Sequence, residues 1–206
     1  MRGVRMSSVL AEPADLSAAT DRIVAFIGDL GLAIRDGDVP ADAFLPGVRI
    51  ADGGLVVDRT AMFIPGDLLH EAGHLAVIPG RYRQRIGDDV DAGVAQIRAE
   101  AAGAGDRDPV LDGLEGLGGE LQAIAWSYAA CRHLGLPLEI VFKPGAYGTD
   151  KNGGADPMMI AQQIEMGFFP GLHRLIQAGM TAPPQSILYP DAPPGGFPAM
   201  RRWMQP

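Results

Sequence analysis

The residues most able to do chemistry lie in the segment His70-Glu71-Ala72-Gly73-His74, which contains two of the four histidines of the chain. On an α-helix, residues i and i+4 lie on the same face, so both imidazoles can reach one ion. A glutamate beside them can take a proton from a water molecule bound to that ion. The segment therefore predicts two zinc ligands, His70 and His74, and a general base, Glu71.

The flanking residues favour a short, mostly buried helix over the alternative, a surface helix with two solvated histidines. Pro65-Gly66 breaks the preceding segment, and Asp67 lies in the first turn, where a carboxylate interacts favourably with the helix dipole. Pro79-Gly80 ends the helix about one turn after His74. An apolar band runs along the same segment and consists of Leu68, Leu69, Ala72, Leu75 and Ala76.

A catalytic zinc site normally has three protein ligands and a water molecule. The metzincin pattern would require glycine and histidine at the positions that hold Val77 and Gly80, so that pattern is excluded. The third ligand must then be a downstream carboxylate. Glu120 is the candidate, because it opens the strongly apolar segment 121–130, where a carboxylate is costly unless it has a partner.

Two alternatives to this ligand assignment stay open. Glu115 is the main competitor, and Glu120 would otherwise only stabilise the N-terminus of its helix. Three aspartates, Asp88, Asp89 and Asp91, would suit an aspartate-type site but lie in a polar segment without a framing helix.

The order of elements resembles the gluzincin branch of the HExxH zincin metallopeptidases. The segment 120–127, Glu-Leu-Gln-Ala-Ile-Ala-Trp-Ser, is similar to the E-x-x-A-x-x-aromatic-small helix of the compact ImmA/IrrE-type metallopeptidases. The resemblance covers about residues 45–135. It implies a zincin-like α+β fold, mainly helical, with a small β-hairpin or sheet beside the HExxH helix. It also implies Zn²⁺ held by His70, His74 and Glu120.

These residues predict a zinc-dependent hydrolase, a peptidase or amidohydrolase that uses a metal-activated water with Glu71 as general base. An additional electrophile would stabilise the developing oxyanion. The candidates are Tyr128, Tyr147, His133 and His173, and Tyr147 is preferred because it lies in the glycine-rich segment 145–155, which could close over a substrate.

Two other functions are compatible with the same residues. One is a catalytically inactive metal-binding domain that binds a protein partner through its proline-rich tail. The other is a domain in which zinc has a structural role. The sequence does not define the peptide or amide substrate or the oligomeric state.

Composition limits the class of protein. A chain of 206 residues with 47% hydrophobic and 20% charged residues is typical of one globular domain, here residues 1–206 with a proline-rich tail at about 181–206. A net charge of −8 argues against nucleic acid as a partner. No run of eighteen apolar residues and no secretory signal is found, so no membrane partner is expected. The single cysteine, Cys131, fits a cytoplasmic location and a small buried apolar role.

The hydrophobic pattern predicts the remaining elements. A hairpin turn is expected at Asp52-Gly53. The basic segment 81–85 is expected to be solvated, and Trp203 to pack back onto the body. Helices are expected at 15–35, 90–102, 118–134, 157–166 and 171–178, extended segments at 61–64 and 138–142, and a turn-rich path at 181–198.

Overall fold

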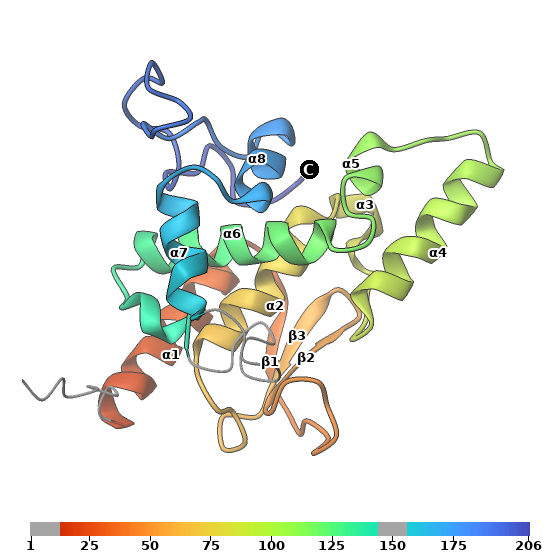
Figure 1. The fold of residues 1–206 in the computed structure, drawn as a ribbon. Coiled ribbons are helices and arrows are strands. Elements are labelled where there is room, and N and C mark those ends of the chain that lie inside the picture. Colours follow the sequence, from red (N-terminus) through yellow and green to blue (C-terminus); the bar gives the residue numbers. More distant parts are fainter. Residues whose placement is uncertain (1–12, 144–155) are drawn as a thin grey trace, which may run out of the picture.

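The structure is a computed structural model that describes residues 13–143 and 156–206, with side chains from residue 16 onward (Figure 1). The fold is α+β and mainly helical, with one three-stranded sheet, as the sequence predicts. The elements are α1 (Pro13–Asp29), β1 (Ile34–Asp36), β2 (Val48–Ala51), β3 (Gly54–Val57), α2 (Gly66–Val77), α3 (Gly80–Arg83), α4 (Val90–Gly103), α5 (Pro109–Asp112), α6 (Gly118–His133), the 3-10 helix η1 (Leu138–Ile140), α7 (Pro157–Glu165) and α8 (Pro170–Gln177).

The sheet has the strand order β1-β3-β2, with β2 antiparallel and β1 parallel to β3. The predicted hairpin is confirmed. Asp52 and Gly53 both have positive φ, 53° and 69°, and this backbone shape matches the twist of a two-residue hairpin turn. The predicted helix at 15–35 is too long, because Gly31 with φ 80° follows its end at Asp29 and the chain then enters β1.

The predicted metal-bearing helix is confirmed as α2, and every residue from Gly66 to Val77 in it is buried. It lies between the sheet and α6. A Cβ atom at Gly73 would lie 2.9 Å from the Ala123 carbonyl oxygen, so the two helix backbones approach closely there. The Ser127 hydroxyl donates to the Leu69 carbonyl at 3.1 Å. These two contacts, one between backbones and one from a side chain to a backbone, fix the position of α6 relative to α2.

Two predicted extended segments are wrong. Residues 61–64 form a turn, since the Asp58 carboxylate accepts hydrogen bonds from the Thr60 and Ala61 amides. Residues 138–142 contain η1 in place of a strand, because the amides of Ile140 and Val141 bond to carbonyls three residues earlier. A short apolar run that is buried in either conformation does not distinguish the two.

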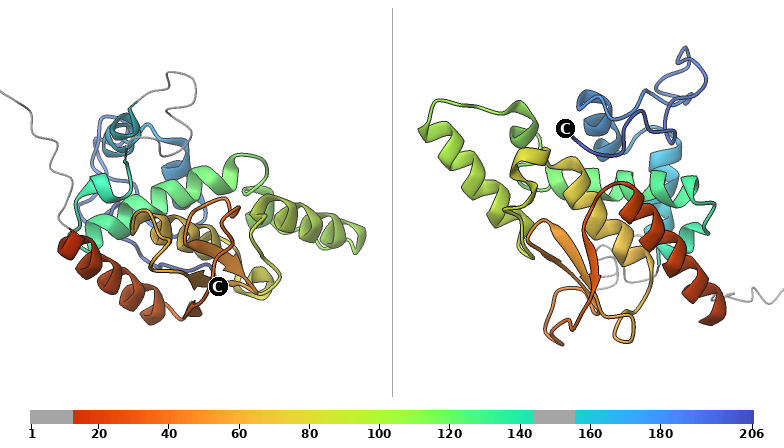
Figure 2. Two further views of the ribbon diagram at one scale, coloured as in Figure 1. Left: turned by 90° about the horizontal axis from the view of Figure 1, so that it is seen from below. Right: turned by 180° about the vertical axis from the view of Figure 1, so that it is seen from behind.

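The C-terminal segment packs on the helices, as predicted for Trp203. Its ring lies edge-on to Phe26 and Trp126, with ring centroids 5.1 Å and 5.5 Å away. The Trp126 indole N–H donates to the Trp203 carbonyl at 2.8 Å, and the Gln205 amide donates to the Ala76 carbonyl at 2.9 Å. Figure 2 shows α1 beside α2 and the projecting helix α4.

Arg83 corrects the prediction of a solvated basic segment. Its guanidinium is half-buried and donates to the carbonyls of Leu75, Ile78 and Gln205 at 2.9–3.0 Å. It therefore joins the C-terminal end of α2 to the end of the chain. Arg81 and Arg85 are exposed, as predicted, and pair with Asp108 and Glu100.

For the part of the chain whose placement is described, no helix combines the length and the hydropathy needed to cross a bilayer.

Replacement of Trp203 by alanine is expected to destabilise the protein by about 2–3 kcal/mol, because it removes a large ring packed on two aromatic side chains. Urea unfolding measures this loss. Phe44→Ala is the control, since Phe44 is 92% exposed and its truncation should leave the midpoint unchanged. Equal midpoints for Trp203→Ala and the wild type would contradict the packing role.

Candidate metal centre

One face of α2 carries four buried polar side chains, Asp67, His70, Glu71 and His74, each no more than 9% exposed. Their positions, i, i+3, i+4 and i+7, place them along a single helical stripe. The other residues of α2 are apolar or glycine. The helix therefore presents one continuous polar stripe within an otherwise apolar interior.

Glu120 meets this stripe from α6. Its Oε2 atom lies 3.4 Å from His70 Nε2 and 3.1 Å from His74 Nε2. The two Nε2 atoms lie 3.2 Å apart, and the imidazole rings are nearly perpendicular at 83°. His70, His74 and Glu120 thus form a cluster that could hold a metal ion, and their donor atoms all lie within 4.8 Å of one another.

The spacing of these three atoms tests the fit of a metal. In a tetrahedral site with bonds of 2.0–2.1 Å, two ligand atoms lie roughly 3.3 Å apart. The distances in this cluster, 3.1, 3.2 and 3.4 Å, match that edge length. The donor set therefore suits a small divalent ion with one coordination position not taken by these residues.

A glycine at the start of α6, Gly118, allows the chain to bring Glu120 next to the two histidines. A Cβ at Gly118 would lie 2.4 Å from the Gly113 carbonyl oxygen, so only glycine allows the tight approach into α6. Glu115, the alternative ligand, pairs instead with Arg98 at 2.9 Å. It is not part of the cluster.

The aspartates of the preceding segment have other contacts. Asp88 lies 3.9 Å from Arg49, and the Asp89 carboxylate caps α4 by accepting from the Ala92 amide. Asp91 lies in the first turn of α4. None of the three belongs to the cluster of His70, His74 and Glu120.

The two glutamates of the site differ in their proton affinity. Burial raises the pKa of Glu71 to about 7, and the nearby Glu120 charge adds to this effect while His74 opposes it. Burial alone would also raise the pKa of Glu120, but hydrogen bonds and charge from His70 and His74 outweigh it and hold that pKa well below its usual range. Glu120 is therefore a permanent anion, whereas Glu71 exchanges its proton near neutral pH.

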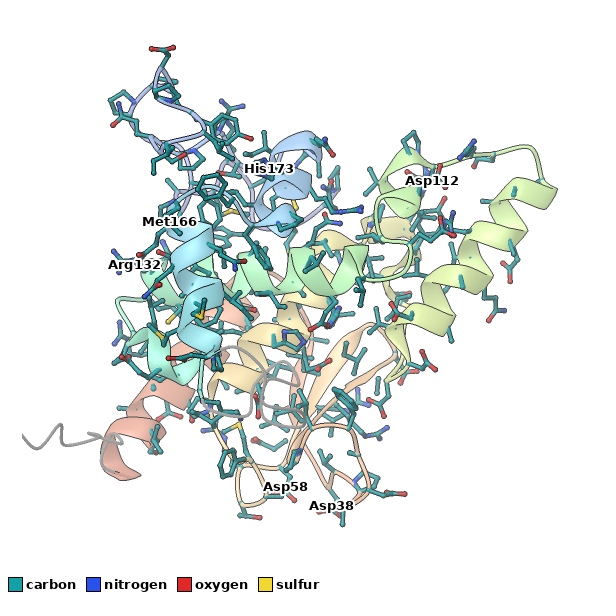
Figure 3. All side chains as sticks on the ribbon, in the orientation of Figure 1. Asp38, Asp58, Asp112, Arg132, Met166 and His173 are labelled. Atoms are coloured by element: carbon teal, nitrogen blue, oxygen red, sulfur yellow. The ribbon has the colours of Figure 1, made fainter. Side chains whose placement is uncertain are left out.

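Three of the four predicted electrophiles, Tyr128, His133 and His173, have contacts outside the cluster. The Tyr128 hydroxyl donates to Glu165 at 2.9 Å, and His133 packs against Phe26 and Trp203. His173 lies on α8 with Nδ1 2.6 Å from the Tyr189 hydroxyl, away from α2 (Figure 3). Tyr147, the preferred candidate, lies outside the described residues.

The structure adds a residue that the sequence reasoning missed. Lys143 Nζ lies 3.1 Å and 3.0 Å from the two carboxylate oxygens of Asp67, and both side chains are largely buried. Burial raises the Asp67 pKa, and the Lys143 charge opposes that rise. The sequence placed Asp67 in the first turn of the helix, but no local signal connects Lys143 to it.

Cys131 is buried, as predicted, and burial raises the pKa of its thiol to about 12. It is a small core residue beyond the cluster.

Comparison with known proteins found no matching family, no matching curated protein and no matching solved structure. Function must therefore be inferred from the geometry of the site.

Glu120→Gln is expected to weaken zinc binding at least about 100-fold, because it removes the anionic ligand that joins both histidines. A competition titration against a chromophoric chelator measures the affinity. Glu115→Gln is the matched control and should bind as the wild type does, since Glu115 pairs with Arg98. Wild-type affinity in Glu120→Gln would exclude Glu120 as a ligand.

The raised pKa of Glu71 makes the stability of the metal-free protein depend on pH. Glu71 binds its proton more tightly in the folded protein than in the unfolded chain, so its contribution to stability is lost as pH rises from about 4.5 to about 7. Glu71→Gln should therefore be more stable than the wild type at pH 8, by about 1–3 kcal/mol, and similar to it at pH 5. Urea unfolding of both proteins at the two pH values measures the difference, and an equal difference at both would contradict it.

Proposed function

We propose that the protein is a zinc-dependent hydrolase, a peptidase or amidohydrolase with a gluzincin-like HExxH site. The observation that carries this proposal is the convergence of three ligand atoms, from His70, His74 and Glu120, next to a buried glutamate with a pKa raised to about 7. A structural site would normally have four protein ligands. Three ligands and an adjacent proton acceptor favour catalysis.

The donor set favours Zn²⁺ among the ions that imidazole and carboxylate ligands accept. Two imidazole nitrogens and one carboxylate oxygen suit Zn²⁺, whereas Mg²⁺ and Ca²⁺ prefer oxygen ligands alone. Held by His70, His74 and Glu120, the ion would supply a bound water of lowered pKa and would polarise a substrate carbonyl.

Glu71 would act as the proton carrier. Its carboxylate would accept a proton from the attacking water and later transfer it to the leaving amine. A pKa near 7 suits both steps, because the group then gains and loses a proton at little cost near neutral pH. Glu120, as a permanent anion, would remain a ligand throughout.

The two other functions find less support. A tail that binds a partner should be free, yet residues 181–206 are bonded to the body through Trp203 and Gln205. A structural zinc is needed where a domain lacks a sufficient hydrophobic core. Here one cluster of buried apolar residues extends from Ala19 to Phe197. This core predicts that the fold survives removal of the metal.

Glu71→Gln is expected to keep zinc and to lose peptide hydrolysis by at least about 100-fold, because it removes the proton acceptor and no metal ligand. Digestion of a peptide library, followed by mass spectrometry and by zinc analysis of the same samples, measures both properties. A chelator should abolish the wild-type cleavage while the far-ultraviolet circular dichroism is retained. Cleavage by Glu71→Gln at the wild-type rate would exclude the proposed mechanism.

A further inference from the structure

We propose that Lys143 binds an anionic group of the substrate, so that the site takes substrates with a carboxylate near the scissile bond. This inference rests on the proposed function, because it concerns a ligand of the same metal site. It assigns a role to a buried cation that the proton-transfer mechanism does not use.

The first observation is the place of Lys143 on the stripe of α2. Its Nζ atom is bound to both carboxylate oxygens of Asp67. Asp67 precedes His70 by three residues, a rise of about 4.5 Å along the helix axis and a little less than one turn. The Lys143 ammonium is thereby held beside the metal ligands, about one turn toward the N-terminus of α2.

The second observation concerns the groups that surround this largely buried ammonium. Asp67 occupies one side of it, and the Phe63 ring lies on another, 4.6 Å from Nζ. The Phe63 side chain is 72% exposed, whereas Lys143 itself is 15% exposed. In this proposal an anion takes the place of the Phe63 ring beside Nζ, while the contact with Asp67 is kept.

The third observation is the distribution of charge along the stripe. Asp67, Glu71 and Glu120 are acidic, and Asp88 contributes further negative charge. Lys143 is the cation that pairs with this stripe within the described part of the chain. A carboxylate ligand would be repelled at the other positions and is tolerated beside Lys143.

The opposite end of the stripe has a different character. A narrow crevice adjoins His74 there, and Asp91 is the charged residue at its edge. Most of its lining is aliphatic and comes from Val77, Ile78, Val90, Val94 and Leu114. This crevice is too narrow to admit a water molecule, so the substrate contact proposed here is the one at Lys143 alone.

The competing explanation is that the Asp67–Lys143 pair only ties α2 to the segment after η1. A purely structural pair would affect stability when either partner is replaced, and it would not change the charge preference of a ligand. The two explanations differ in the sign of the effects, since removal of Asp67 and removal of Lys143 alter the local charge in opposite directions.

The test uses the zinc-loaded full chain and two hydroxamates as probes. Succinic acid monohydroxamate carries a carboxylate at a distance similar to one helical turn from its metal-binding group, and butanohydroxamic acid is a neutral analogue. Calorimetric titration should show that the wild type binds the carboxylate probe about tenfold more tightly than the neutral one. Lys143→Met should lose this preference, and Asp67→Asn should increase it.

The double variant Asp67→Asn/Lys143→Met serves as the matched control. It removes both charges at once, so it avoids a buried unpaired carboxylate and should bind both probes equally. A wild type that binds zinc but shows no preference for the carboxylate probe would overturn this inference alone. The inference would also be overturned if Lys143→Met and Asp67→Asn both keep the wild-type preference for the carboxylate probe. Failure of the wild type to bind zinc would overturn the proposed function as well.

Discussion

The structure depends on the burial of four ionisable side chains along one stripe of α2. An isolated buried charge is strongly unfavourable, so each of these groups requires a partner or a bound proton. Glu120 Oε2 lies within 3.4 Å of the Nε2 atoms of His70 and His74, and Lys143 provides a counter-charge for Asp67. Within the described residues no ion pair is formed by Glu71, and burial raises its pKa to about 7. The proton acceptor that we propose is thus the group that the surrounding pairs leave uncompensated.

The rest of the fold positions these partners. The helix α6 brings Glu120 and crosses α2 at Gly73, and the segment after η1 brings Lys143. The close approach at Gly66, where a Cβ would lie 1.9 Å from the Ile140 carbonyl oxygen, holds that segment against the start of α2. Arg83 then joins the end of α2 to the final residues of the chain. Each end of the metal-bearing helix is therefore fixed by a contact distant in sequence.

The sequence predicts what is local in this site and misses what is not. The spacing of His70 and His74, the helix that carries them and the hairpin at Asp52-Gly53 follow from short-range patterns, and all are present. The preference for Glu120 over Glu115 rested on the cost of a carboxylate in an apolar segment, and the cluster includes Glu120. Lys143 was not predicted, because its pairing with Asp67 links positions 76 residues apart.

The close crossing of α2 and α6 also has a consequence for ion selectivity. Because backbone meets backbone at Gly73 and Ala123, the gap between the helices cannot widen or narrow through side-chain rearrangement. The separation of the helix backbones that carry the histidines and Glu120 is therefore nearly fixed. An ion that requires bonds of 2.3–2.6 Å, such as Ca²⁺, would have to force the two helices apart. If the cluster holds an ion, a glycine that makes no contact with that ion would thus contribute to selection by ionic radius.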